Sequence, residues 1–229
     1  LVYGFDARSE ADFVGNDADD SVTGGNDDNI LIGGLGDDVL DGAGGNDVLI
    51  GGAGDDVLVF DSADIRRVDG GSGHDTLRID GGNQTLDLSD QNQNAGANYQ
   101  RPTNIEIVDL AGTGNNSLTL DASDLFHFTG AADGQQNLLR VDGNAGDSVA
   151  TGTSGLWRNL GEADSDGQLG GNGYTLYQDG EARLLVQDGV EQTGINVARP
   201  AVVQLASLPA ADGFRVDGAA ANDNSGRAL

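Results

Sequence analysis

Single aliphatic residues recur every nine positions near the start of the chain. They are Val22, Leu31, Leu40, Leu49 and Leu58, and most residues between them are Gly, Asp or Asn. A Gly- and Asp-rich stretch without such a phase is typical of a flexible acidic linker. A phase that is kept from residue 15 to residue 59 predicts a repeat architecture instead.

The period belongs to five consecutive nonapeptides that fill residues 15–59 without a gap. Each begins with Gly, carries Asp or Asn at its sixth position and has an aliphatic residue at its eighth. Six turn-forming residues followed by three strand-forming residues suit half a coil of a β-roll better than a hairpin. Two nonapeptides then complete one coil, so that equivalent residues of alternate nonapeptides stack on one another. We expect only the eighth side chain to point into the core.

The roll is expected to continue to residue 78. Residues 60–69 form a degenerate turn with one extra residue, and residues 70–78 (GGSGHDTLR) return to the pattern. We therefore expect a single-residue bulge between them. The repeats at 15–23 and 24–32 depart most from the pattern, so we expect weaker sites in both.

Short strands without glycine-rich turns follow, in which apolar residues alternate with polar ones as in half-buried strands. A short helix is expected at 121–128 and a hairpin at 174–186, where Asp179-Gly180 favours a tight turn. We interpret 79–200 as a β-rich capping region, because an open end coil exposes apolar side chains and unpaired backbone. The predicted fold class is all-β: a right-handed parallel β-roll stacked on this cap.

Charge narrows the choice of partner. The 229 residues include 38 Asp and Glu against 11 basic residues, all of them Arg, for a net charge of -27. Nucleic acids and anionic membranes need basic surface, so neither is expected as a partner. The balance favours a cation instead, because a chain this acidic repels itself when compact and is therefore either partly disordered or neutralised by bound metal. No apolar run is long enough for a membrane-spanning helix, and without Cys there are no disulfides and no Cys nucleophile.

The stacking places pairs of sixth-position side chains around common cavities. The expected pairs are Asp20 with Asp38, Asp38 with Asp56, Asp56 with Asp75, and Asn29 with Asp47. Carboxylates combined with backbone carbonyls suit Ca²⁺, whereas Zn²⁺ and Cu²⁺ prefer His or thiolate and Mg²⁺ demands strict octahedral geometry. Without the metal these carboxylates would repel one another, so we predict that folding of 15–78 is coupled to calcium binding.

The nonapeptides resemble the GGxGxDxUx repeats of RTX proteins, and the repeats at 33–41, 51–59 and 70–78 fit every defined position. The resemblance implies several Ca²⁺ ions. One turn would hold each ion through the carbonyls of its second and fourth positions and its Asp. The turn two nonapeptides further on would add the carbonyls of its first and third positions and its own Asp. It implies sites between 24–32 and 42–50, between 33–41 and 51–59, and between 51–59 and 70–78.

The ligand residues expected on this basis come from the turns of the array. They are Asp20, Gly25, Asp27, Asn29, Gly33, Gly34, Leu35, Gly36, Asp38, Gly42, Ala43, Gly44, Gly45, Asp47, Gly51, Gly52, Ala53, Gly54, Asp56, Gly70, Ser72 and Asp75.

The resemblance also implies export by type I secretion and folding outside the cell, so the expected location is secreted, extracellular or at the cell surface. Region 79–200 is similar to strand-rich segments of large bacterial adhesins, and 201–229 resembles the start of an FG-GAP propeller blade. Residues 1–14 are expected to form a strand and a lead-in. The chain starts without Met or a signal peptide, so we expect a monomeric module of a longer protein.

Three functions remain open from the sequence. The first is a non-catalytic, calcium-dependent folding module and rigid scaffold for adhesion. The second is a carbohydrate- or peptide-binding adhesin domain with a cell-surface glycan or protein as its partner, in which Trp157, Tyr174 and Tyr177 form either a stacking platform or part of the core. The third is a non-catalytic part of a secreted enzyme. We expect no catalytic activity, because neither HExxH nor GxSxG occurs in the chain.

Overall fold

The computed structural model describes residues 11–60, 65–88, 102–129, 137–152 and 156–197. The strand predicted near the N-terminus and the C-terminal segment that resembles an FG-GAP blade lie outside the described residues.

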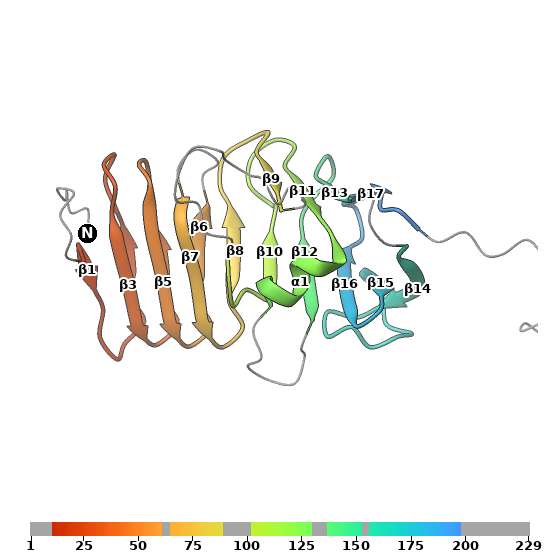
Figure 1. Ribbon diagram of the computed structural model, residues 1–229, viewed down its shortest axis with the longest axis horizontal. Helices are drawn as coiled ribbons and strands as arrows, with labels where there is room; N and C mark the ends of the chain where they lie inside the picture. Colours follow the sequence, from red (N-terminus) through yellow and green to blue (C-terminus); the bar gives the residue numbers. More distant parts are fainter. Residues whose placement is uncertain (1–10, 61–64, 89–101, 130–136, 153–155, 198–229) are drawn as a thin grey trace, which may run out of the picture. The chain divides into compact units, whose positions relative to one another are not determined.

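The described chain winds into a solenoid in which two β-layers share one core (Figure 1). The first layer is a nine-stranded sheet with the spatial order β14 (Arg158–Ala163), β15 (Tyr174–Asp179), β16 (Ala182–Gln187), β12 (Leu138–Asp142), β10 (Ile107–Asp109), β8 (Thr76–Ile79), β6 (Val57–Phe60), β4 (Val39–Asp41) and β2 (Ser21–Thr23). The second layer contains two four-stranded sheets. One consists of β1 (Phe13–Val14), β3 (Ile30–Leu35), β5 (Asp47–Ala53) and β7 (Ile65–Ser72). The other consists of β9 (Thr85–Asp87), β11 (Ser117–Leu120), β13 (Ser148–Thr151) and β17 (Glu191–Gly194).

Successive nonapeptides alternate between the two layers. Leu31 of β3 pairs in parallel with Leu49 of β5, and Leu40 of β4 pairs with Leu58 of β6. All four side chains are buried in the shared core. Each pair joins alternate nonapeptides, which confirms the predicted parallel β-roll.

The degenerate turn continues the roll with one extra residue. Strand β7 pairs with β5, and its register shifts by one residue after the partner of Asp47. Leu58 consequently pairs with Leu77, one position later than the regular spacing would place its partner. The predicted single-residue bulge is therefore confirmed.

Beyond residue 78 the parallel stacking goes on with a longer period. Val108 of β10 pairs with Leu77 on one side and with Val141 of β12 on the other. Each of these steps along the chain is longer than the two nonapeptides that separate partners in the array. Strands β9, β11, β13 and β17 stack in the same way in the second layer. The predicted β-rich character is confirmed, and neither the nine-stranded sheet nor the core is interrupted at residue 78.

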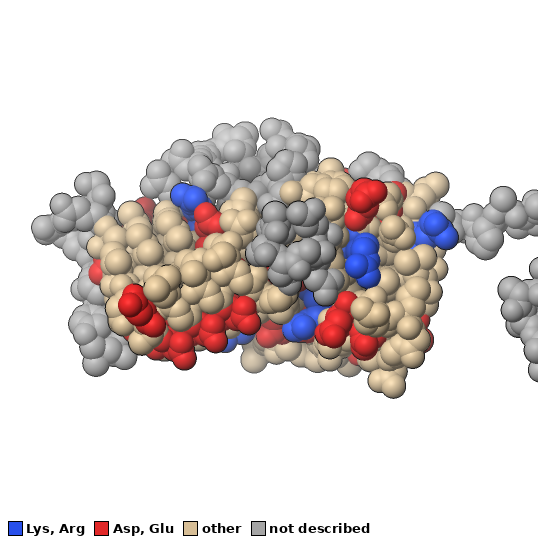
Figure 2. Space-filling model, turned by 90° about the horizontal axis from the view of Figure 1, so that it is seen from below, with Lys and Arg blue, Asp and Glu red and all other residues tan. Residues whose placement is uncertain are grey.

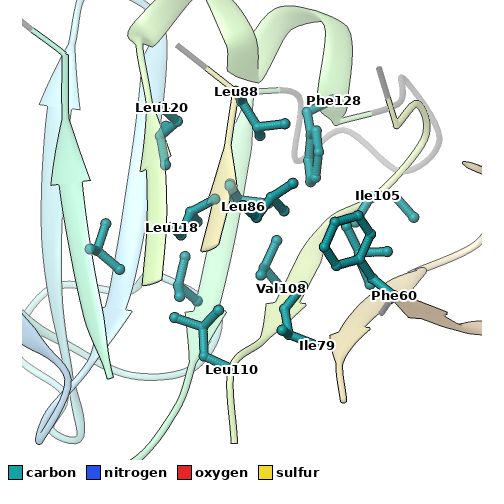
Figure 3. Close-up of a cluster of buried hydrophobic side chains, with 14 of the residues drawn as sticks. Phe60, Ile79, Leu86, Leu88, Ile105, Val108, Leu110, Leu118, Leu120 and Phe128 are labelled. Carbon is teal, nitrogen blue, oxygen red and sulfur yellow. The ribbon is translucent and has the colours of Figure 1, made fainter. Parts of the chain in front are cut away.

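The core of this second part is a cluster of aliphatic and aromatic side chains between the layers, to which Phe60 of β6 also belongs (Figure 3). Helix α1 (Ala122–Phe128), close to the predicted helix, adds Leu125 and Phe128 to it, whereas Phe126 stays half exposed. The β15–β16 hairpin is confirmed, although its two-residue loop is Gly180-Glu181 and thus begins one residue later than expected. Antiparallel β14 completes that edge of the sheet.

Candidate calcium site

The turns of the array form two rows at the edges of the roll. Row one contains the turns at 15–20, 33–38, 51–56 and 70–75, and row two the turns at 24–29 and 42–47. Of the predicted ligand residues, row one holds Asp20, Gly33, Gly34, Leu35, Gly36, Asp38, Gly51, Gly52, Ala53, Gly54, Asp56, Gly70, Ser72 and Asp75, and row two holds Gly25, Asp27, Asn29, Gly42, Ala43, Gly44, Gly45 and Asp47.

Sixth-position side chains are buried almost as completely as the leucines. The exposed fraction is at most 1% for Asn29, Asp38, Asp47, Asp56 and Asp75. The expectation that only the eighth position points inward was therefore wrong. The side chain turns in where the turn enters the strand, because there it can accept hydrogen bonds from backbone N–H groups of the neighbouring coil.

These hydrogen bonds join the predicted pairs. In row one the backbone N–H of Asp20 donates to Oδ1 of Asp38 at 2.7 Å, that of Asp38 to Oδ1 of Asp56 at 2.8 Å, and that of Asp56 to Oδ1 of Asp75 at 2.9 Å. In row two the N–H of Asn29 donates to Oδ1 of Asp47 at 2.7 Å. All four expected pairs are thus in contact, and each carboxylate uses one oxygen for a neighbouring backbone.

The second oxygen of three of these carboxylates accepts no hydrogen bond from a neighbouring backbone. Oδ2 of Asp38, Asp56 and Asp75 is buried and accepts no hydrogen bond from any described residue. Buried polar atoms are nearly always paired, because leaving one unpaired forfeits its interaction with water without replacement. A repeated unpaired oxygen therefore indicates that each turn is built around a further partner.

First-position glycines show what faces these oxygens. A Cβ at Gly33 would overlap both Asp38 Oδ2 and the carbonyl oxygen of Gly51. A Cβ at Gly51 would likewise overlap Asp56 Oδ2 and the carbonyl oxygen of Gly70. A carboxylate and a carbonyl of the next turn thus meet beside each glycine. Two acceptors that face each other need a cation or a donor between them, and hard oxygen ligands favour Ca²⁺.

The backbone positions implied by the resemblance are only partly free. Gly34 and Gly36 have positive φ values of 120° and 102°, which orient the turn peptides in a way that side chains disfavour. The third-position carbonyls of Ala53 and Ser72 accept hydrogen bonds from the N–H groups of Gly36 and Gly54, both at 2.9 Å. Each carbonyl keeps a second lone pair with which it could bind a cation.

In the two degenerate turns, hydrogen bonds from the same turn occupy the sixth-position side chain. Asp20 Oδ2 accepts hydrogen bonds from the backbone and the side-chain amide of Asn16, at 3.3 and 3.2 Å. In row two, Asn29 Oδ1 accepts the N–H of Gly25 at 2.7 Å, and its buried Nδ2 has no partner among the described residues. Asp20 therefore has its second oxygen already occupied and Asn29 carries no charge, so both offer a cation less than Asp38 and Asp56 do.

Burial and mutual repulsion act on the protonation of row one. Burial raises the pKa of Asp56 to about 6 and that of Asp75 to about 7, and it also raises the pKa of Asp38. A backbone N–H opposes each rise, while the charges of neighbouring acidic side chains add to it. A metal-free row one is therefore electrostatically unfavourable at neutral pH.

Fifth-position acids form a second, outer series of contacts. Asp37 N–H donates to Asp19 Oδ1 at 3.0 Å, Asp55 N–H to Asp37 Oδ1 at 2.8 Å, and His74 N–H to Asp55 Oδ1 at 2.8 Å. The three carboxylates are exposed, and they tie adjacent turns together. Figure 2, seen from the side of row one, shows acidic side chains aligned across the roll.

Two residues outside the nonapeptides continue the sixth-position pattern. The backbone N–H of Asp75 donates to Glu106 Oε2 at 3.0 Å, and that of Asn116 donates to Asp147 Oδ1 at 2.8 Å. Neither contact was expected from the sequence. The signal for Glu106 was present, because an acidic residue precedes the β10 strand as Asp75 precedes β8, but no glycines marked the turn.

The described residues contain no cluster of three or more His, Cys, Asp or Glu side chains that could hold a metal. The candidate sites do not need one, because each combines the carboxylates of two turns with backbone carbonyls, a ligand set that Ca²⁺ accepts. In the same part of the chain, no helix is long and apolar enough to cross a membrane.

Comparison with protein families gives one match. Residues 13–40 and 32–63 match the family model of the RTX calcium-binding nonapeptide repeat (4 copies). Comparison with curated proteins and with solved structures found no match for this chain. RTX nonapeptide repeats bind calcium ions, several per module, and are typical of secreted bacterial proteins. The turns between residues 15 and 56 therefore lie in a stretch that matches the RTX calcium-binding nonapeptide repeat.

Proposed function

We propose that this chain is a calcium-triggered folding module of a secreted or cell-surface bacterial protein. One observation carries the proposal: row one buries a series of carboxylate oxygens that face carbonyl oxygens and accept no hydrogen bond within the described structure. A cation between successive turns would convert this repulsion into attraction.

The strongest site would lie between the turns at 33–38 and 51–56. Asp38 and Asp56 would supply the charge, and the carbonyls of Gly34, Gly36 and Gly51 would supply further oxygens, with Ala53 adding its second lone pair. The turns at 51–56 and 70–75 would form an equivalent site. Row two has one carboxylate, Asp47, opposite the amide of Asn29, so its site would bind calcium more weakly.

Calcium would therefore act as a compartment signal. In cytosol with little free Ca²⁺, the repulsion among buried Asp side chains would keep 15–78 unfolded, which is compatible with type I secretion. Outside the cell, millimolar Ca²⁺ would fill the turns, and binding free energy would become folding free energy.

The folded solenoid would serve as a non-catalytic, rigid scaffold for adhesion by other parts of a longer protein. The glycan-binding alternative relied on aromatic rings that are exposed together. Trp157 is fully buried, Tyr177 is 5% exposed, and Tyr174 is partly buried with its hydroxyl donating to Asp142 at 2.8 Å. These rings do not form an exposed stacking platform, so we favour the scaffold over a binding domain.

Far-UV circular dichroism of the whole chain tests the proposal. We expect little β signal in excess chelator and a large gain when Ca²⁺ is added, with no comparable gain from Mg²⁺. A β signal that is the same in chelator and in calcium would refute calcium-triggered folding.

A matched pair of substitutions locates the effect. Asp56→Asn removes a buried carboxylate that would serve two sites, whereas Asp17→Asn removes the same charge from an exposed residue of the array. We expect Asp56→Asn to raise the calcium midpoint of folding at least tenfold and Asp17→Asn to leave it within twofold. Equal midpoints for both variants would contradict the assigned site.

A further inference from the structure

A short turn at residues 103–106 stacks on the turn of the last nonapeptide in row one. The carbonyl of Thr103 accepts the N–H of Gly70 at 3.0 Å, as a strand residue does before each regular turn. Asn104 then has a positive φ of 55°. Because Ile107 pairs with Thr76, Glu106 stands opposite Asp75. The short turn at 103–106 therefore replaces a six-residue turn while keeping its first and last contacts.

Contacts at this junction repeat those between the regular turns. Asp75 N–H donates to Glu106 Oε2 at 3.0 Å, just as the N–H of Asp56 donates to Asp75 Oδ1. A Cβ at Gly70 would overlap the carbonyl oxygen of Asn104 and lie 2.5 Å from Asp75 Oδ2. The carbonyl of Asn104 thus faces Gly70 in the same way as the carbonyl of Gly70 faces Gly51.

The decisive atom is Asp75 Oδ2. It belongs to a fully buried side chain and accepts no hydrogen bond from the described residues, although it faces the Asn104 carbonyl. Glu106, which is 8% exposed, brings a second carboxylate to the same place. Two carboxylates and a carbonyl therefore converge at this junction.

We propose that the junction is a further calcium site, formed by Asp75, Glu106 and the carbonyl of Asn104 with the turn carbonyls of Gly71 and Gly73. The site rests on the proposed function, but it lies outside the repeats and uses a Glu in place of the sixth-position Asp. The extra methylene of Glu106 lengthens its reach from a turn that has fewer residues.

The short turn also predicts how this site differs from the others. It has no residue equivalent to the third position, so one carbonyl ligand is missing. Glu106 lines a cavity of about 440 Å³ together with Asp55, His74, Thr76 and Arg140. Water from this cavity would complete the coordination sphere, since Ca²⁺ accepts water as a ligand. This ion would bind more weakly than those between the regular turns of row one.

An ion here would join two parts of the solenoid. Asp75 belongs to the last nonapeptide, whereas Asn104 and Glu106 lead into β10 and the long-period coils. The site would therefore fasten the calcium-dependent array to the strands that follow it, and it would fill after the row-one sites as calcium rises.

Equilibrium dialysis with radioactive calcium, at concentrations up to 10 mM, tests the site in the full chain. Glu106→Gln keeps an oxygen that can accept the Asp75 N–H but removes the charge. Glu181→Gln, in the exposed hairpin loop, removes the same charge elsewhere. We expect Glu106→Gln to lose one ion that binds more weakly than those of row one, or to weaken that ion at least tenfold, and Glu181→Gln to match the wild type. Unchanged number and affinity in Glu106→Gln would overturn the proposal.

If Glu106→Gln does not fold, a crystallographic measurement on the wild-type chain still tests the junction site. Crystals grown in calcium and soaked with Tb³⁺ should show an anomalous peak within coordination distance of Asp75 Oδ2, Asn104 O and Glu106. Peaks between regular turns but none at the junction would overturn this site and leave the proposed function intact. A chain that binds no calcium at all would overturn both.

Discussion

At the scale of the residue, the regular turns of row one depend on carboxylate and carbonyl oxygen atoms that approach one another with no hydrogen-bond donor between them. Asp38 and Asp56 each give one oxygen to a backbone N–H and keep the other buried beside a carbonyl. The first-position glycine makes this approach possible, because any Cβ would occupy the same space. The first-position glycine and the sixth-position aspartate therefore act as one unit.

Replacing Gly51 by Ala should disturb a site directly. The new Cβ would overlap Asp56 Oδ2 and the Gly70 carbonyl, and such overpacking typically destabilises a fold by about 1–3 kcal/mol. Gly25→Ala is the control, because its Cβ would meet nothing within 4 Å. We expect a higher calcium midpoint by circular dichroism for Gly51→Ala only, and the same midpoint in both variants would contradict this reasoning.

Protonation of the same carboxylates predicts a pH dependence of the metal-free chain. Burial raises the folded-state pKa of Asp56 to about 6 and that of Asp75 to about 7, above the ordinary value of 3.8. Below that ordinary value both groups are protonated in either state, and the folded state carries no penalty. As pH rises to about 7 the unfolded state ionises first, so folded stability is lost across this window.

In chelator we therefore expect more β signal near pH 4 than at pH 7.5. Calcium binding should also release protons around pH 6, which calorimetry in buffers of different ionisation enthalpy would detect. A metal-free β signal that rises between pH 4 and pH 7.5 would show that the sign is wrong.

At the scale of the element, the nonapeptide coils of the array and the long-period coils beyond residue 78 contribute strands to the same two β-layers. The array repeats every two nonapeptides and leaves carbonyls facing carboxylates. In the long-period part, the amide of buried Asn116 donates to the carbonyls of Leu110 and Gly81 at 3.0 and 3.4 Å. A side-chain donor thus fills a place that a cation would fill in the array.

Asn116→Asp should therefore destabilise the long-period coils. It would replace a donor with a carboxylate oxygen beside the Leu110 carbonyl, and a buried unsatisfied group costs about 1–3 kcal/mol. The control is Asn115→Asp, because Asn115 is exposed. Urea denaturation in saturating calcium at neutral pH would measure the difference, and equal midpoints for the two variants would contradict the role of the amide.

At the scale of the whole molecule, charge opposes compaction. The net charge of -27 is concentrated partly in the aligned acids of row one (Figure 2). Unlike charge screening by salt, which acts between exposed groups, a bound cation reaches carboxylates that are buried.

We therefore expect calcium to shrink the chain where monovalent salt does not. Size-exclusion chromatography at constant ionic strength should give a smaller hydrodynamic radius in 5 mM CaCl₂ than in NaCl with chelator or in 5 mM MgCl₂. The same radius in all three solutions would argue that general screening, and not site binding, controls compaction.

The roll could be predicted from the sequence because its information is local and periodic. The phase of Leu31, Leu40, Leu49 and Leu58 determined that successive nonapeptides alternate between two layers. The sixth-position acids could then be paired by counting two nonapeptides along the chain. Even the one-residue bulge followed from the spacing of glycines.

Only the tertiary structure decided where the solenoid continues. Insertions lengthen the period beyond Leu77, which pairs with Val108 as Val108 pairs with Val141, so no fixed spacing marks the stacked strands. Whether a carboxylate meets a second acceptor also depends on its neighbour in space, because Asp38 and Asp56 face the carbonyls of Gly51 and Gly70 from the next coil.

The sequence by itself determined the repeat and its metal, because both depend on residue type at a constant interval. Glu106 and Asn104 reach the end of row one through contacts between positions far apart in the sequence. No regular spacing in the sequence predicts those contacts, because only folding brings residues 103–106 next to the turn at 70–75.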